Sequence, residues 1–104
     1  MGRRIGLYGN YFEDFYFEQT QKVKDKIDYV LDIIKHVSQV PIKFLKHIEG
    51  TEGLYEIKVK TTFKNIRIFC FFDQGNLIIL TNCIEKKSQK TPKEPLDLAI
   101  KLKQ

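Results

Sequence analysis

A lone arginine stands inside an otherwise apolar stretch of the sequence. Arg67 lies between Ile66 and Ile68, and the stretch continues with Phe and Cys as far as Phe72. A guanidinium can bind two oxygens of one phosphate as a planar fork, and such contacts are strongest in a site that excludes water. Arg67 is therefore the first candidate for binding an anion. The alternative is an ion pair with Glu56 from a neighbouring strand, and both interpretations stay open.

Lysines gather on both sides of this arginine in the sequence. Four cations and no acid lie between Lys58 and Arg67, and four more cations lie between Lys86 and Lys93. Most surface lysines are only solvated, but cations on or beside adjacent strands form a patch suited to phosphate. We therefore expect RNA as the partner. Aromatic side chains that are candidates to stack on its bases are Tyr55, Tyr8 and Phe69.

Few side chains are candidates for moving a proton. Glu56 is the only carboxylate expected near Arg67, and a lysine with a lowered pKa is the competing candidate. His36 and His47 lie in no motif of a hydrolytic site, so we expect them to be solvated surface residues. The sequence has no metal-ligand spacing and no glycine-rich phosphate loop. We therefore expect neither a metal nor a cofactor.

Length and composition indicate one soluble domain. A chain of 104 residues with 42% apolar and 30% charged residues can bury one core but not two. Its net charge of +5 favours an acidic partner only weakly. No apolar stretch approaches the roughly 20 residues of a membrane helix. Cys70 and Cys83 have no CxxC spacing, so we expect buried thiols, no membrane and a cytoplasmic protein.

Three strand-like segments carry the candidate residues. These segments alternate between apolar and polar positions or are rich in β-branched and aromatic residues, and they span Leu54–Lys60, Ile66–Asp73 and Asn76–Ile84. If residues 74–75 form a two-residue hairpin loop, Arg67 lies opposite Asn82 and Cys70 lies opposite Ile79. Both faces of this antiparallel sheet are apolar enough to be covered, one of them by a long helix.

Helical periodicity dominates before and after these strands. A short strand within Arg3–Gly9 is followed by helix from Phe12 to Val37, with a break near Gln19–Gln21. A short helix is expected over Ile42–His47, after Pro41. Thr91 to Glu94 has the form of a capping box, but Pro95 predicts a later start for the last helix, near Leu96. Its inner face would carry Leu96, Ala99 and Ile100.

Several segments together resemble one protein family. The segment GLYEIKV begins at Gly53, IRIFCFF begins at Ile66, and KKSQKTPKEPLDLAIKLK begins at Lys86. With the preceding FLKHIEG, they resemble the phage-derived HigB-like branch of the RelE/ParE toxin superfamily, for which KKxxKTP is fairly specific. The resemblance implies an α+β fold with N-terminal helices packed on a small twisted antiparallel sheet and a short C-terminal helix. Residues 1–104 would form a single domain.

The resemblance also implies an activity and partners. It implies the toxin of a type II toxin–antitoxin pair, a metal-independent endoribonuclease that cleaves mRNA on the ribosome and so inhibits translation and growth. The antitoxin would be a helix-turn-helix protein, and operator DNA would be reached only through it. The alternatives are a toxin that binds a protein target such as gyrase, and an inactive relative that only binds its antitoxin. We assign catalysis to Arg67, Lys58, Lys87 and Glu56, and RNA binding to Lys60, Lys86, Lys90 and Tyr55.

Overall fold

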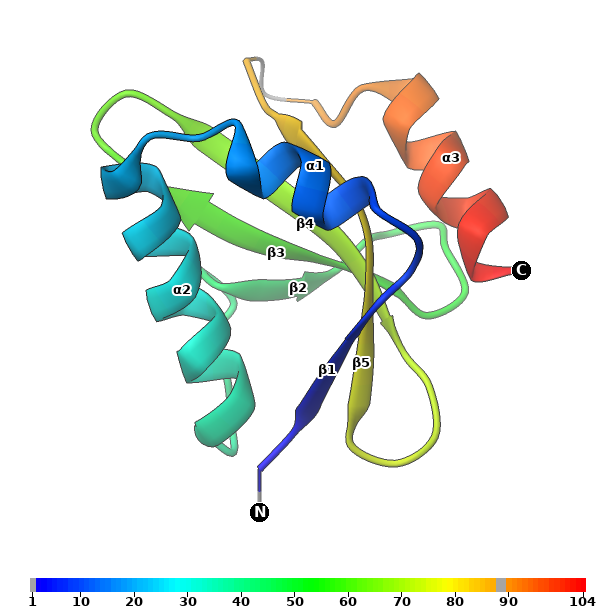
Figure 1. The fold of residues 1–104 in the computed structure, drawn as a ribbon. Helices are drawn as coiled ribbons and strands as arrows, with labels where there is room; N and C mark the ends of the chain where they lie inside the picture. The colour runs from blue at the N-terminus through cyan, green and yellow to red at the C-terminus, as the bar shows by residue number, and fades with distance from the viewer. Residues whose placement is uncertain (1, 88–89) are drawn as a thin grey trace.

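A computed structural model describes residues 2–87 and 90–104 of the chain (Figure 1). Its elements, in chain order, are β1 (Arg4–Leu7), α1 (Tyr11–Phe17), α2 (Gln21–His36), β2 (Leu45–His47), β3 (Leu54–Lys60), β4 (Asn65–Phe72), β5 (Leu77–Glu85) and α3 (Lys93–Lys103). These strands form one sheet in the order β1-β5-β4-β3-β2. Neighbours from β2 to β5 are antiparallel, while β1 pairs parallel with β5. The predicted α+β class is confirmed, with a mixed sheet.

The helical region divides in two where the sequence predicts a break. α1 ends at Phe17, and Thr20 adopts an extended backbone whose hydroxyl oxygen accepts the N–H of Val23 at 3.4 Å. This contact caps the first turn of α2, where backbone N–H groups have no helical partner. α2 then buries Val23, Ile27, Val30 and Ile34 against the sheet. Within the described residues, no helix is long and apolar enough to cross a membrane.

Alternation along the strands gives the sheet two different faces. On the first, which we call the core face, β3 and β4 contribute Ile57, Val59, Ile66, Ile68 and Cys70 to the main apolar cluster under α2. On the second, which we call the pocket face, Leu54 and Phe69 pack against Ala99 of α3. α1 and α2 thus lie on one side of the sheet and α3 on the other (Figure 1). The predicted apolar positions of α3 are confirmed.

The predicted helix over Ile42–His47 is wrong. A turn forms there instead, closed by a 2.9 Å hydrogen bond from the N–H of Phe44 to the carbonyl of Pro41, and β2 follows it. A helix of so few residues is costly to nucleate, whereas the free edge of β3 offers backbone groups for pairing. The pairing places Lys46 directly opposite Glu56.

The predicted register of the last hairpin is also wrong. The N–H of Asp73 donates to the carbonyl of Leu77 at 2.8 Å, so the loop has three residues, 74–76, rather than two. Within it Gly75 has a φ of +59°, a conformation that side chains with a Cβ disfavour. This loop shifts the pairing by one residue, so that Cys70 lies opposite Leu80.

A β-bulge shifts the register a second time. Between the pairs Ile68–Cys83 and Cys70–Leu80, two residues of β5 face the single residue Phe69 of β4. The hydroxyl of Thr81 donates to the carbonyl of Phe69 at 3.1 Å, which satisfies a backbone group beside the irregularity. Arg67 therefore lies opposite Ile84 rather than Asn82.

The last helix begins earlier than predicted. α3 starts at Lys93 rather than near Leu96, and Pro95 lies within its first turn. The N–H that proline lacks would have no helical partner at that position, so the helix tolerates it. Pro92 is the N-cap residue and no side chain caps this end, so the predicted capping box does not form.

The two cysteines are separate free thiols, as predicted. Cys70 is buried and Cys83 is half-buried, and they are not opposite each other in the sheet. Burial raises the pKa of both thiols, that of Cys83 to about 12. The reactive thiolate form is therefore scarce at neutral pH, and both side chains act as small apolar residues.

Candidate active site

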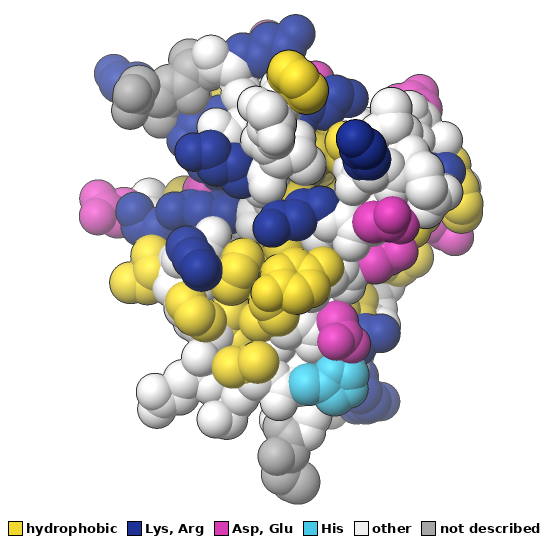
Figure 2. Space-filling view, turned by 90° about the vertical axis from the view of Figure 1, so that its left-hand side faces the viewer, with side chains coloured by type: hydrophobic (Ala, Val, Ile, Leu, Met, Phe, Trp, Pro, Cys, Tyr) yellow, Lys and Arg dark blue, Asp and Glu magenta, His cyan; other side chains and the backbone are white. Residues whose placement is uncertain are grey.

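A basic pocket of about 480 Å³ opens on the pocket face. Its walls come from β2, β3, β4 and the segment around the end of β5. The charged residues that line it are Lys46, Glu49, Glu56, Lys58, Arg67, Lys86 and Lys90. Figure 2 shows Lys and Arg side chains gathered over the upper part of one side of the molecule. Since cations outnumber acids in its lining, the pocket favours an anionic ligand.

Arg67 is the most buried cation of this pocket, with 9% of its surface exposed. Its Nε lies 2.8 Å from Oε1 of Glu56, so the ion pair anticipated from the sequence is present. Its Nη1 donates to the carbonyl of Ile66 at 3.2 Å and to Oδ1 of Asn65 at 3.4 Å. A buried guanidinium without such partners would be strongly destabilising. These contacts hold Arg67 in one orientation.

The ion pair with Glu56 does not occupy every N–H donor of the Arg67 guanidinium. The Nε–H of Arg67 is not aligned for a hydrogen bond with any protein acceptor of the described residues, although the Glu56 carboxylate is in contact. Of its two terminal nitrogens, only Nη1 donates to an acceptor within residues 2–87 and 90–104. The edge that carries Nη2 therefore remains for a phosphoryl oxygen, while Glu56 compensates the charge of Arg67.

Lys58 is directly opposite Arg67 in the β3–β4 pair and shares the pocket with it. Burial lowers the pKa of Lys58, and the neighbouring cations Lys46, Arg67 and Lys86 lower it further. The carboxylate of Glu56 acts in the opposite direction. A lowered pKa makes the neutral amine, which accepts protons, more accessible near neutral pH. Lys58 thus matches the lysine of lowered pKa that competes with Glu56 as the candidate for moving a proton.

The structure brings most of the predicted site residues together, but not all. Glu56, Lys58, Arg67, Lys86 and Lys90 line the same pocket. Lys60 and Lys87 line a neighbouring hollow, to which Lys86 also contributes. Lys87, to which we assigned catalysis, therefore does not line the pocket that contains Arg67.

The three aromatic side chains considered for stacking do not reach the pocket. Tyr55 lies on the core face, with its ring centroid 5.3 Å from that of His47 and 5.1 Å from that of Phe72. Successive residues of a strand point to opposite faces, so Tyr55 cannot share a face with Glu56. Phe69 is on the pocket face but is fully buried against α3. Tyr8 follows β1, at the far edge of the sheet from β2.

Sequence reasoning missed half of the residues that line the pocket, among them Lys46 and His47. Both were assigned to a helix, and only the pairing of β2 with β3 brings them to the pocket. The ring of His47 is held by its Nε2, which lies 3.1 Å from the carbonyl oxygen of Thr51. The apolar residues at 44, 45 and 48 show no strict alternation, so no pattern in this segment predicts a strand.

Comparison with known families agrees with this architecture. Residues 14–104 match the family described as Phage derived protein Gp49-like (DUF891). The chain belongs to the Gp49-like family. The matched range includes both long helices, the four antiparallel strands and all residues of the pocket. No curated protein matches the Gp49-like chain.

Comparison with solved structures identifies the fold. The archaeal RelE–RelB complex from Pyrococcus horikoshii OT3 contains a chain that superposes on the Gp49-like chain with a TM-score of 0.57. The two are 15% identical, and the match covers 82% of this chain and 96% of that chain. At this identity the likeness shows the fold alone. It confirms the RelE-like fold that the resemblance implied, and the phage-derived family of the match agrees with that resemblance.

Proposed function

We propose that this Gp49-like chain is the toxin of a type II toxin–antitoxin pair and cleaves mRNA on the ribosome. The observation that supports it most is Arg67, held at the buried end of a basic pocket with one edge of its guanidinium available. The similar archaeal RelE is bound to RelB, which supports an antitoxin as a partner here. We further propose that the antitoxin is a helix-turn-helix protein, that the toxin reaches operator DNA only through this antitoxin, and that it acts in the cytoplasm.

The proposed reaction is attack of a ribose 2′-oxygen on the adjacent phosphorus. The 2′-hydroxyl loses its proton, the new P–O bond forms, and the bond from phosphorus to the 5′-oxygen breaks. The 5′-oxygen takes a proton from a protonated lysine of the pocket, which leaves a 2′,3′-cyclic phosphate and a 5′-hydroxyl. Negative charge grows on the phosphoryl oxygens, and Arg67 stabilises it through Nη2, the terminal nitrogen that donates to no acceptor among the described residues. Lys46, Lys86 and Lys90 bind the flanking backbone.

Lys58 is the proton acceptor in this proposal. Oε1 of Glu56 already lies 2.8 Å from Nε of Arg67, so we assign this carboxylate the task of orienting the guanidinium. Lys58 faces the same pocket, and its pKa is lowered by burial and by the cations around it. A base whose pKa lies nearer the working pH is unprotonated in a larger fraction of molecules and is still basic enough to accept the proton. Glu56 is then a positioning residue that orients Arg67 and compensates its charge.

A reconstituted translation reaction tests the proposal. The purified protein is added to ribosomes translating a defined mRNA, and the RNA ends are mapped and tested for 2′,3′-cyclic phosphate. We expect cleavage that requires ribosomes and is absent with Arg67→Ala. Intact mRNA with blocked translation would indicate a protein target instead. Normal translation with intact mRNA would indicate an inactive relative that only binds its antitoxin.

A further inference from the structure

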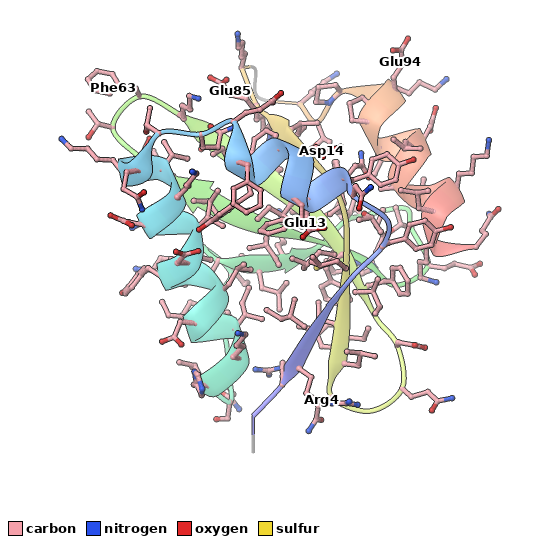
Figure 3. The ribbon with its side chains drawn as sticks, in the orientation of Figure 1. Arg4, Glu13, Asp14, Phe63, Glu85 and Glu94 are labelled. Atoms are coloured by element: carbon pink, nitrogen blue, oxygen red, sulfur yellow. The ribbon has the colours of Figure 1, made fainter. Side chains whose placement is uncertain are left out.

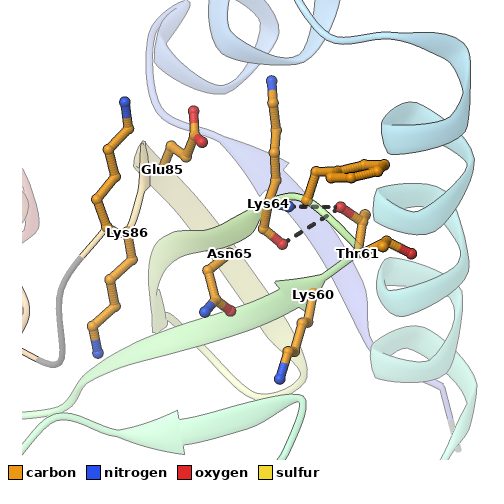
Figure 4. A pocket seen from close by; sticks show the side chains of 9 residues that line it. Lys60, Thr61, Lys64, Asn65, Glu85 and Lys86 are labelled. Carbon is orange, nitrogen blue, oxygen red and sulfur yellow. Dashed lines mark hydrogen bonds between the residues drawn. The ribbon is translucent and has the colours of Figure 1, made fainter.

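A second hollow of about 370 Å³ lies beside the pocket, at the end of the β3–β4 hairpin (Figure 4). Its lining includes four lysines and one acid, together with an aromatic residue; these are Lys60, Lys64, Lys86, Lys87, Glu85 and Phe63. None of the functions assigned above to the pocket requires Phe63 or Lys64. The presence of these two residues beside the lysines therefore points to a separate role for the hollow.

Phe63 is the most exposed large apolar side chain of the described residues, with 93% of its surface in solvent. It projects from the tip of the β3–β4 hairpin (Figure 3). Exposed turns favour Gly, Asn, Asp and Ser, each for a backbone reason that phenylalanine does not share. Because Phe63 buries almost no surface in the fold, it contributes little to stability. Its ring is available to a partner.

The turn that presents Phe63 is held by several hydrogen bonds. The N–H of Thr61 donates to the carbonyl of Lys64 at 2.9 Å. The N–H of Lys64 donates to the hydroxyl of Thr61 at 3.0 Å (Figure 4). The ammonium of Lys64 donates to Oε1 of Gln19 at 2.8 Å, which ties the turn to the junction of α1 and α2. An ordered turn lowers the entropy lost when the exposed ring binds a partner.

The hollow adjoins the pocket. Lys86 lines both of them, and Asn65 of the hollow accepts a hydrogen bond from Arg67 of the pocket. Lys60 lies two residues beyond Lys58 on the same face of β3, about 7 Å further along the strand. That is about the length of one nucleotide in an extended single strand. A strand of RNA bound in the pocket would thus pass directly into the hollow.

We propose that this hollow is a subsite for a nucleotide next to the cleaved one. Phe63 stacks on its base, and Lys60, Lys86 and Lys87 bind its phosphate. The subsite rests on the proposed function, because it extends the same RNA beyond the scissile bond. An aromatic ring beside a track of cations is how proteins bind single strands without reading their sequence. One aromatic side chain among lysines is too small an apolar area for a protein interface.

Binding of a single-stranded RNA tests the subsite. The probe is a fluorescent 2′-O-methyl oligonucleotide of about 12 nucleotides, which resists cleavage, and its affinity is measured by anisotropy. We expect Phe63→Ala to weaken binding about tenfold, while Phe63→Trp binds at least as tightly as the unchanged chain. The control is Tyr11→Ala, which removes an exposed aromatic at the start of α1. It should leave the affinity unchanged, and all variants should melt at the same temperature.

A series of oligonucleotides with one abasic residue locates the stacked base. At one position, removal of the base should weaken binding by the unchanged chain and have no further effect on Phe63→Ala. If Phe63→Ala binds the RNA as tightly as the unchanged chain, the subsite is wrong while the pocket and its cleavage reaction stand. If the unchanged chain binds no RNA and cleaves none, the subsite and the proposed function both fail. Loss of antitoxin binding with unchanged RNA affinity would overturn the subsite in favour of a protein interface.

Discussion

The two faces of the sheet use neighbouring residues of the same strands for opposite purposes. On the core face, Ile57 of β3 and Ile68 of β4 are fully buried under α2. On the pocket face, the adjacent residues Glu56, Lys58 and Arg67 line a basic pocket, and α3 packs elsewhere on this face. Since consecutive residues point to opposite faces, one strand can stabilise the fold and position charges at the same time. Substitutions on the two faces should therefore have separable effects.

The distribution of charge follows the same division. α1 carries Glu13 and Asp14 on its exposed surface (Figure 3), and α2 carries Asp25, Asp28 and Asp32. The pocket and the hollow are lined mainly by lysine and arginine. Residues 11–36 hold six acids and four lysines, so the net charge of +5 comes from the rest of the chain, where the pocket and the hollow form a basic side. An anionic chain approaching the molecule is steered toward the basic side.

The largest expected effect on stability comes from the core face. Ile68→Ala should lower the free energy of unfolding by about 2–5 kcal/mol, because it leaves a cavity in the main apolar cluster. Urea denaturation measures the change. The control on the same sheet is Lys60→Ala, an exposed position expected to stay within about 0.5 kcal/mol. Similar losses for the two variants would contradict the division between the faces.

Removal of Arg67 should separate activity from folding. Arg67→Ala should reduce mRNA cleavage by about 10²–10³-fold and abolish growth arrest while the protein stays folded, because the phosphoryl oxygens lose the guanidinium that stabilises their charge. Arg67→Lys should also be poor, since an ammonium is a single point charge and cannot contact Glu56 and the phosphate through separate nitrogens. Cleavage in the translation reaction and thermal melting are measured on the same preparations.

A double variant distinguishes this role from a purely structural one. Arg67→Ala leaves the buried Glu56 without its partner, which itself destabilises the fold. Arg67→Gln combined with Glu56→Gln removes both charges, so it should recover stability and stay inactive. If Arg67→Ala unfolds the protein and the double variant cleaves mRNA, the ion pair is structural and the catalytic assignment is wrong.

Lys58 should give the cleavage rate a distinctive pH dependence. The neutral amine is the base, so the rate should rise with pH and level off below the usual pKa of lysine, because burial lowers the pKa of Lys58. Lys58→Arg stays protonated throughout and should lose both the rise and most of the activity. Lys60→Arg, an exposed change on the same strand, should keep the profile. A profile unaltered by Lys58→Arg would leave the base to be found elsewhere.

The same pKa shift predicts a change in stability with a definite sign. Between the lowered folded-state pKa of Lys58 and its unfolded-state pKa, the unfolded chain binds more protons than the folded one. The contribution of Lys58 to stability therefore rises with pH across that window. Lys58→Met should remove this dependence, as measured by denaturation at a series of pH values.

The smallest expected effects come from the lysines after β5. Replacing Lys86, Lys87 and Lys90 with Gln should weaken RNA or ribosome binding and lower the salt slope by about one unit per lysine. Thermal stability should change little, because charged groups near the surface contribute little to folding. The control, Lys22, Lys26 and Lys35 of α2 changed to Gln, removes the same charge from the helical side. Equal slopes for the two triple variants would mean that these lysines do not bind RNA.

The elements themselves were largely predictable from the sequence. Period-two alternation predicted Leu54–Lys60 with its observed bounds, and runs of β-branched and aromatic residues predicted the other two long strands to within a residue at each end. The helical period predicted α1 and α2, and its interruption predicted the break between them. Local patterns predict such elements because a helix or strand with one buried face carries its apolar residues at the period of that element. The segment around KKxxKTP carried the resemblance to the phage-derived HigB-like branch.

Tertiary structure alone decided how the elements are placed. The sequence pattern of β4 and β5 is compatible with several registers, and the three-residue loop and the bulge at Thr81–Asn82 select one. The first one-residue shift exchanges the faces of β5 beyond the loop, so Ile78 and Leu80 turn to the core face. The bulge adds a second shift, which restores the predicted face and places Ile84 rather than Asn82 opposite Arg67. Residues 45–47 became a strand because β3 had a free edge, which brought Lys46 to the pocket. The sequence thus determined which residues of a strand alternate between its two faces. Long-range pairing decided which residues of neighbouring strands lie opposite each other.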